Sequence, residues 1–205
     1  PNGGCYKKGS STLVLESTKG TSQLTIGTQG KHILFKSKDA IQTGKSLSQL
    51  NIKGSDTIYS GSGFGIQNNT TVNVGSNATA KVLIQKRFVL GSGSQVHVNG
   101  PFIRKNLAGQ NVPAFSVYTK DSSSNIGALL NNSSKSKLAV YAPKTNLTLN
   151  NSGAVYGSAI GNKVYKYSSG SVHFDKTLKK IQLTQGSGST TASSLVGVVS
   201  SWRQT

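Results

Sequence analysis

The sequence predicts an all-β protein, a single-domain right-handed β-solenoid, or parallel β-helix. Short β-prone runs follow one another along most of the chain, and only Gly, Asn, Ser or Pro separates them. None of these runs is long enough for a helix. Glycine supplies 24 of the 205 residues, which suits tight corners where the backbone needs positive φ. Strands joined by tight corners, with each coil resting on the last, are typical of a solenoid.

Residues 1–10 are predicted to be a flexible lead-in, and the solenoid is predicted to span residues 11–185. Alternation within LTI, LNI, VNV and VHV places one face of each strand inward and the other outward. The runs in the first half are STLVLE (11–16), SQLTIG (22–27), KHILFKS (31–37), AIQTG (40–44), QLNIKG (49–54), TIYSG (57–61), GFGIQ (63–67), TVNVG (71–75), KVLIQKRFVLG (81–91), QVHVNG (95–100) and PFIRK (101–105).

Residues 104–136 are the least regular part of the chain, and they predict an insertion in the form of a loop, a protruding hairpin or one short helix. The strand pattern then returns with LAVYAP (138–143), LTLNNSG (147–153), AVYGSAIG (154–161), KVYKYSSG (163–170), SVHF (171–174) and KIQLT (180–184). Residues 186–205 contain a Gly/Ser/Thr linker and an apolar stretch that ends at Trp202. We expect them to form a C-terminal cap, because an open solenoid end exposes unpaired backbone.

The charge balance indicates a polyanionic partner. Lys and Arg total 23 against five acids, which gives a net charge of +18. Such an excess favours DNA or another polyanion, and lysine follows phosphates without reading bases. The alternative is that a basic surface only keeps an acid-poor protein soluble. The chain has one cysteine, Cys5, which is either a free thiol or a partner for a cysteine outside this chain.

If coils stack in register, outward lysines on successive coils form a ladder along the rod. We predict a DNA or polyanion surface from the densest local groups of cations and their neighbours. The predicted residues are Lys81, Lys86, Arg87, Arg104, Lys105, Lys135, Lys137, Lys163, Lys166, Lys179 and Lys180. Tyr165 and Tyr167 alternate with Lys166, so they either stack on exposed bases or belong to an aromatic ladder of the rod.

The sequence argues against an enzyme. Glu16, Asp39, Asp56, Asp121 and Asp175 are scattered, and catalysis by acid pairs needs them clustered. His173 and Asp175 should lie on one side of a strand, either as a functional pair or as a hydrogen bond at the end of the solenoid. No His or Cys lies at ligand spacing, so we predict no metal, no cofactor and no small-molecule substrate.

Five features of the C-terminal part resemble the PilX-type proteins of type IV pilus assembly, and the ComZ-like minor pilins among them. These are YAP (141–143), the polar ladder 147–153, VYGSAIGNKV (155–164), GSVHFD (170–175) and the terminal SWRQT (201–205). The resemblance covers about a third of the chain. It implies an exported protein with an N-terminal pilin-like helix, which this chain lacks, and a β-solenoid body displayed at the cell surface. For ComZ-like minor pilins it implies capture of DNA during uptake.

We therefore expect an extracellular, non-enzymatic surface protein that binds DNA or another polyanion and associates with pilus subunits or with itself. The alternative is a structural or adhesive subunit whose solenoids stack into a pilus, an extracellular fibre or a bactofilin-like polymer.

Overall fold

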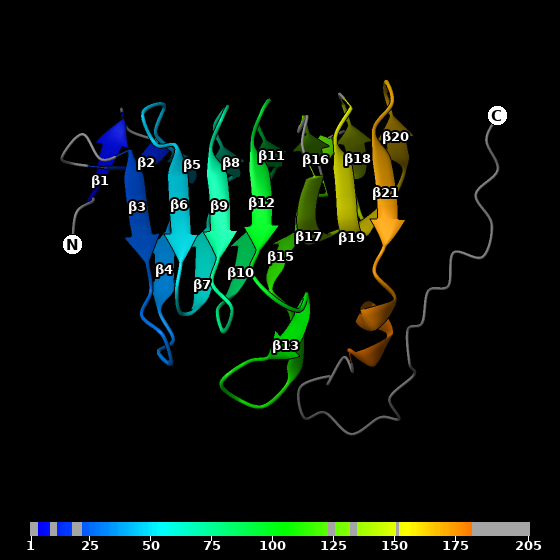
Figure 1. Ribbon diagram of the computed structural model, residues 1–205. Helices are drawn as coiled ribbons and strands as arrows, with labels where there is room; N and C mark the ends of the chain where they lie inside the picture. Colours follow the sequence, from blue (N-terminus) through cyan, green and yellow to red (C-terminus); the bar gives the residue numbers. More distant parts are fainter. Residues whose placement is uncertain are drawn as a thin grey trace.

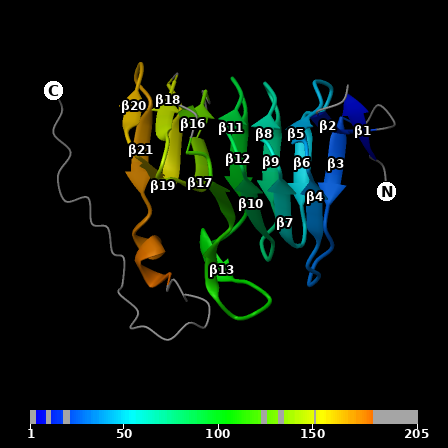
Figure 2. The ribbon, with the colours of Figure 1, turned by 180° about the vertical axis from the view of Figure 1, so that it is seen from behind.

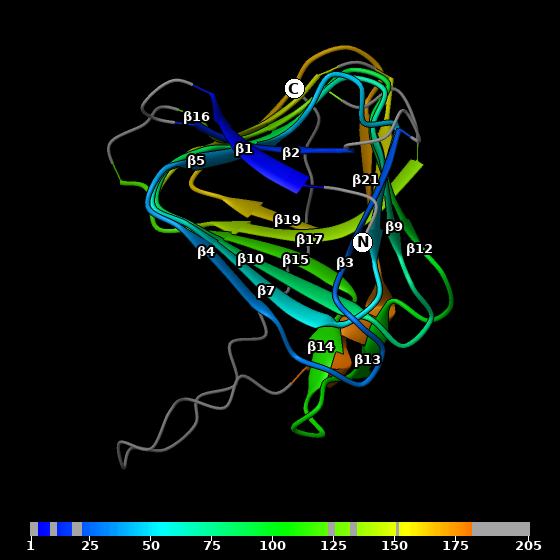
Figure 3. The same ribbon diagram turned by 90° about the vertical axis from the view of Figure 1, so that its left-hand side faces the viewer.

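The computed structural model describes residues 4–8, 12–17, 22–122, 126–131, 135–150 and 152–181, without the side chains of residues 4–8 and of Lys180. These residues form a parallel β-solenoid with three long sheets that wrap around one apolar core (Figure 1). The predicted fold class is confirmed. Seen along the axis from the N-terminal end, the coils outline a triangle, and the chain turns clockwise as it recedes (Figure 3). That sense is right-handed, as parallel crossovers almost always are.

Each sheet takes strands from successive coils (Figures 1 and 2). Sheet A contains β1 (Gly4–Lys8), β2 (Thr12–Glu16), β5 (Ala40–Thr43), β8 (Phe64–Ile66), β11 (Phe88–Leu90), β16 (Ile126–Leu130), β18 (Asn146–Leu149) and β20 (Val164–Lys166). Sheet B contains β3 (Gln23–Ile26), β6 (Gln49–Ile52), β9 (Thr71–Val74) and β12 (Gln95–Val98). Sheet C contains β4 (Leu34–Ser37), β7 (Ser55–Ser60), β10 (Thr79–Ile84), β15 (Phe115–Thr119), β17 (Lys135–Ala142), β19 (Ala154–Gly161) and β21 (Ser171–Phe174).

The core consists of inward side chains that repeat at the same register on every coil. On sheet A the row contains Ile41, Phe64, Phe88, Ala128 and Leu147, and all of them are buried. The Phe64 and Phe88 rings are parallel within 8°, with centroids 6.2 Å apart. Sheets B and C contribute equivalent rows of Leu, Ile and Val. Each coil therefore needs only a few apolar residues, which explains a folded chain with 34% hydrophobic residues.

Buried hydroxyl groups hold the turns from sheet A to sheet B. Thr43 Oγ1 accepts a hydrogen bond from the Gln67 backbone N–H at 2.7 Å, and Thr70 Oγ1 donates to the Leu47 carbonyl at 2.9 Å. Ser94 Oγ accepts from the Thr70 backbone N–H at 3.1 Å on the next coil. These contacts satisfy backbone groups that the corner would otherwise bury without partners.

Two predicted boundaries differ from the structure. Within the predicted flexible lead-in, Gly4–Lys8 forms strand β1, which pairs antiparallel with β2 at the first edge of sheet A. The predicted insertion over 104–136 is too long, because β15 and β16 pair in register with their neighbours. The excursion is a hairpin of β13 (Ile103–Lys105) and β14 (Asn111–Pro113), one of the three predicted forms. The predicted cap over 186–205 lies outside the described residues.

In the last coils two strands run through the corner between sheets B and C. The Val96 backbone N–H of β12 donates to Ser136 Oγ at the start of β17, while the second half of β17 pairs with β15. Strand β19, which pairs with β17, bends at Gly157, where φ is +144°. A Cβ there would come within 2.2 Å of the Leu138 carbonyl oxygen, so only glycine allows this close approach. After β21, the 3₁₀-helix η1 (Lys176–Lys180) begins at Asp175, whose carboxylate accepts from the Thr177 N–H.

Among the described residues, no helix has the length and apolar character that a membrane crossing requires.

The inward row of sheet A yields a prediction. Phe88→Ala removes a fully buried ring and leaves a cavity between two coils, so the free energy of unfolding should fall by about 3–5 kcal/mol in urea denaturation. Val89→Ala is the control on the same strand, because Val89 is outward and only half-buried; we expect it to cost less than about 1 kcal/mol. Equal losses for the two variants would contradict the assignment of the inward face.

Candidate functional site: a cationic edge and an adjoining groove

Exposed cations gather where strands of sheet C turn into strands of sheet A. We call this line of turns the cationic edge; it is the left-hand corner in Figure 3. Its members follow β4, β10, β15, β17 and β19, and all of them are exposed. They are Lys38, Lys86, Arg87, Lys120, Lys144 and Lys163.

The parallel register of sheet C brings these turns together. Adjacent strands lie about 4.8 Å apart, so the edge extends for about 24 Å from the first coil to the sixth. Backbone contacts fix the turns against each other: the Gly61 N–H donates to the Ser37 carbonyl, and the Lys120 N–H donates to the Ile84 carbonyl. Thr119 Oγ1 also donates to the Lys86 carbonyl at 2.5 Å. Backbone hydrogen bonds therefore join the described parts of these turns, while the cationic side chains extend into solvent.

The other corners carry fewer cations. In the described turns from sheet A to sheet B, Lys45 is the single cation, and Asn, Ser and Gly make up most of the remainder. Two acids, Asp39 and Asp121, belong to the turns of the cationic edge, and Asp121 is buried. With both acids ionised, the edge keeps an excess of four positive charges. Between sheets B and C, the exposed cations of the described connections are Lys31, Lys53 and Lys105, and Lys135 and Lys137 of β17 lie beside this corner. The cationic edge therefore carries six exposed cations, against five near this corner and one between sheets A and B.

Of the predicted surface residues, Lys86, Arg87 and Lys163 lie on the cationic edge. The others lie elsewhere: Lys81 on the outer face of sheet C, Lys105 on the β13–β14 hairpin, Lys135 and Lys137 on the part of β17 beside sheet B, Lys166 at the end of β20, and Lys179 and Lys180 in η1. Sequence reasoning did not select Lys38, Lys120 and Lys144 for the site. The sequence feature that could have identified them is their position, because each follows directly after a strand-like run.

Arg104 was predicted to bind a polyanion, and the structure corrects this. The side chain is buried, with 8% of its surface exposed, and its guanidinium donates five hydrogen bonds to backbone carbonyls. The acceptors are Gly75, Ala78, Asn99 and Pro101. Burial lowers the pKa of this guanidinium. All five of its donors are used, so Arg104 joins the hairpin to the solenoid and leaves no donor for a ligand.

The structure also places two further pairs that the sequence singled out, and stacking of Tyr165 and Tyr167 on exposed bases stays a prediction. The Tyr165 and Tyr167 rings stack on each other at 6.4 Å, and the side chains are 38% and 56% exposed, which places them outside the core. His173 does not pair with Asp175. Its ring stacks on Tyr156 at 4.6 Å, and its Nε2 lies 3.0 Å from Ser171 Oγ, while Asp175 caps η1.

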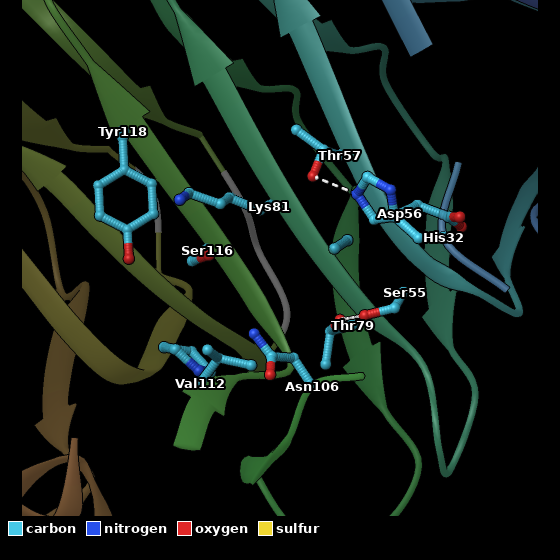
Figure 4. A pocket seen from close by; sticks show the side chains of 12 residues that line it. His32, Ser55, Asp56, Thr57, Thr79, Lys81, Asn106, Val112, Ser116 and Tyr118 are labelled. Atoms are coloured by element: carbon cyan, nitrogen blue, oxygen red, sulfur yellow. Dashed lines mark hydrogen bonds between the residues drawn. The ribbon is translucent and has the colours of Figure 1, made fainter. Parts of the chain in front are cut away.

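A groove of about 230 Å³ lies on the outer face of sheet C, next to the β13–β14 hairpin (Figure 4). Hydroxyl groups from three adjacent strands line its floor, and Ser55 Oγ lies 2.7 Å from Thr79 Oγ1. Lys81 extends toward the Tyr118 ring, with Nζ 5.5 Å from its centroid, which is a cation–π distance. Val112 and Pro113 of the hairpin form one wall. The groove is thus a hollow of mixed polar and apolar lining, with one lysine and one aromatic ring.

Asp56 borders this groove, and the alternation of β7 places its side chain on the buried face of the strand. Neither carboxylate oxygen has a hydrogen-bond partner of normal geometry. Burial raises the pKa of the Asp56 carboxyl above its ordinary value, and the Gly54 N–H, His32 and the Ile33 N–H partly oppose that shift. Among the described residues, no group of three or more His, Cys, Asp or Glu side chains is placed to hold a metal ion.

The family model for a domain of unknown function, DUF7305, matches residues 50–181. The chain belongs to this family. The DUF7305 match runs from β6 to the end of η1, so it includes five of the six cations of the edge and the whole β13–β14 hairpin. No curated protein and no solved structure matches the chain.

Asp56 yields a pH prediction. Its pKa is raised in the folded state, so the folded protein binds this proton more tightly than the unfolded chain does. That contribution to stability is complete below the unfolded pKa of about 3.9 and is lost as pH rises through the folded pKa. Asp56→Asn should therefore stabilise the protein at pH 7 in urea denaturation, with a gain that shrinks toward pH 3. Asp175→Asn is the control, and identical pH profiles for Asp56→Asn and the wild type would contradict the prediction.

Arg104 yields a prediction about stability and polyanion affinity. Arg104→Lys leaves at least two of the five carbonyl contacts unmade, so the free energy of unfolding should fall by about 1–3 kcal/mol. Because the residue is buried, polyanion affinity of the folded variant should stay within about twofold of the wild type. Lys105→Gln is the exposed neighbour for comparison. A loss of affinity in Arg104→Lys without a loss of stability would show that the guanidinium reaches a ligand.

Proposed function

We propose that this protein is a binding protein that holds an extended polyanion along its cationic edge, with DNA as one such polyanion. The observation that carries the proposal is the alignment of six exposed cations on one corner of the rod. Duplex DNA carries one charge per roughly 1.7 Å of its axis, so a ligand laid along about 24 Å of edge presents many phosphates to these side chains.

The chemistry of the edge supports binding without sequence recognition. Five of its six cations are lysines, which act as hydrated point charges on flexible stems. No aromatic side chain lies among these turn residues. Such an edge follows the charge of a backbone and does not read bases, so its affinity should fall steeply with salt.

The placement of the acidic side chains also favours a binding role over a catalytic one. Within the described residues, Asp56 and Asp121 are buried, Asp175 caps η1, and Glu16 accepts a hydrogen bond from the Ser46 hydroxyl. Asp39 follows the carboxyl end of β4, whereas Asp56 lies near the amino end of the adjacent strand β7, so they do not form a pair. General acid–base chemistry needs carboxylates within reach of one substrate.

The resemblance to PilX-type and ComZ-like proteins supports the further proposal that the solenoid is displayed outside the cell as part of a pilus. Treatment of intact cells with a protease would test this, because an exposed solenoid is degraded while a cytoplasmic marker protein survives. Protection of the solenoid in intact cells and loss only after lysis would overturn it.

A structural, filament-forming role is the second candidate, and one observation favours it. Among the described strands, β20 and β21 are the last of their sheets, and neither has a partner strand on its outer side. Phe174 and Tyr167 at this end are each 56% exposed. Such an edge can pair with another chain. Filaments whose length grows with protein concentration, seen by electron microscopy in the absence of any polyanion, would favour this role.

The cationic edge is tested by removing its charges together. A variant with all six edge cations changed to Gln should lose most of its retention on heparin and its affinity for duplex DNA. The slope of log K against log salt should become shallower by up to about 5, since each phosphate contact contributes about 0.9.

The matched control removes six exposed cations from other parts of the rod. These are Lys31, Lys45, Lys53, Lys135, Lys137 and Lys176. The two variants have the same net charge, so a general effect of charge would weaken binding equally in both. Equal loss in the two variants, or retention of the edge variant, would overturn the cationic edge as the binding site.

A further inference from the structure

We propose that the outer face of sheet C, beside the cationic edge, binds an extended acidic polysaccharide whose sugars carry carboxylates. The inference rests on the proposed function in one respect, that the ligand is a polyanion, and it names the class of that ligand. The binding elements are a row of tyrosines with paired lysines and the groove next to the β13–β14 hairpin.

Strand register places large side chains in one outward row along the axis of the solenoid. Each member is the direct register partner of the next, from β4 to β19. The row reads Lys36, Tyr59, Leu83, Tyr118, Tyr141 and Ile160. Tyr141 and Ile160 are 44% and 47% exposed, and the Tyr118 and Tyr141 centroids are 6.1 Å apart. This row is a continuous strip against which flat, partly apolar rings can pack.

Two lysine–tyrosine pairs recur along this face. Lys36 Nζ lies 5.5 Å from the Tyr59 ring centroid, and Lys81 Nζ lies 5.5 Å from the Tyr118 ring centroid. The pairs are two coils apart, which is about 10 Å along the axis. An extended β-1,4-linked sugar chain repeats after two rings over a comparable length. Each two-ring repeat would therefore place one of its two carboxylates near a lysine and one of its two rings near a tyrosine.

The groove supplies the polar contacts that sugar hydroxyls require. Hydroxyls of Ser55, Thr57, Thr79 and Ser116 lie along its floor, on three adjacent strands. Each hydroxyl both donates and accepts, as sugar hydroxyls do. Among the outward positions of the described strands β4, β7, β10 and β15, none is acidic, so nothing on this face repels a carboxylate.

The hairpin gives the groove a rigid wall. Arg104 in β13 bonds the carbonyls of Gly75 and Ala78, which precede β10, and so fixes the hairpin against the strand that carries Lys81. The Ala114 N–H donates to the Phe102 carbonyl at 2.7 Å and closes the base of the hairpin. A preformed wall lowers the ordering cost of binding.

These features favour a polysaccharide over a nucleic acid on this face. Single-stranded nucleic acid binds by stacking its bases on aromatic rings. On this face the Tyr118 ring adjoins a floor of hydroxyl groups, which base stacking does not require. A sugar ring needs contact with aromatic carbons together with several hydroxyl partners, and sheet C offers both within one groove.

The test measures binding of a hexamer of β-1,4-linked D-mannuronate by isothermal titration calorimetry, with the neutral β-1,4-linked mannose hexamer as a control for charge. We expect the acidic hexamer to bind and the neutral one to bind at least tenfold more weakly. Tyr118→Ala and Lys81→Gln should each weaken binding by about tenfold, the effect of losing a central contact. Tyr165→Ala and Lys166→Gln are matched controls on sheet A and should change it by less than twofold.

The outcomes separate this inference from the proposed function. If duplex DNA binds through the cationic edge but the mannuronate hexamer does not bind, the inference is overturned and the proposed function stands. The inference also fails if Tyr118→Ala and Tyr165→Ala weaken binding of the mannuronate hexamer equally. It fails as well if single-stranded DNA binds this face more strongly than the hexamer does. If neither DNA nor the hexamer binds, both proposals fail. Circular dichroism of each variant confirms that the solenoid is intact.

Discussion

The in-register stacking of parallel coils is the constraint on which the rest of the structure depends. Because inward positions must superpose in apolar rows such as Ile41, Phe64 and Phe88, the outward positions and the turns are forced to superpose as well. Any side chain type that recurs once per coil is thereby converted into a line along the rod. The core thus determines both the outward row on sheet C and the succession of turns at the cationic edge.

The β13–β14 hairpin shows how the stack tolerates an interruption. The chain leaves the solenoid after β12 and returns at β15, which pairs with β10 as a strand of an uninterrupted coil would. What makes this possible is the Arg104 guanidinium, which supplies five donors to carbonyls of two loops that lack strand partners. The same residue that completes the packing of the stack also fixes the wall of the groove.

The sequence predicted the fold because strand alternation and glycine-rich corners are local signals. It did not predict where the coils begin and end, because turn lengths vary and strand alternation carries no information about the length of a turn. Neighbouring cations in the sequence, such as Arg104 and Lys105, were a poor guide to the surface, since alternation buries one and exposes the other. Lys120 and Lys144 become neighbours of Lys86 only through the pairing of β10, β15 and β17, which is long-range information.

The placement of charge itself has a physical reason. Like charges that are direct register partners on adjacent strands destabilise a sheet. In the described strand pairs no two lysines are register partners: Lys81 lies between Thr57 and Ser116, and Lys36 faces Tyr59. Side chains in the turns extend into water, where the solvent screens their repulsion. A solenoid with a net charge of +18 can therefore hold exposed cations in its turns, and its flat faces accept lysines where neutral or aromatic residues separate them. The cationic edge and the lysine–tyrosine pairs of sheet C are two consequences of this rule.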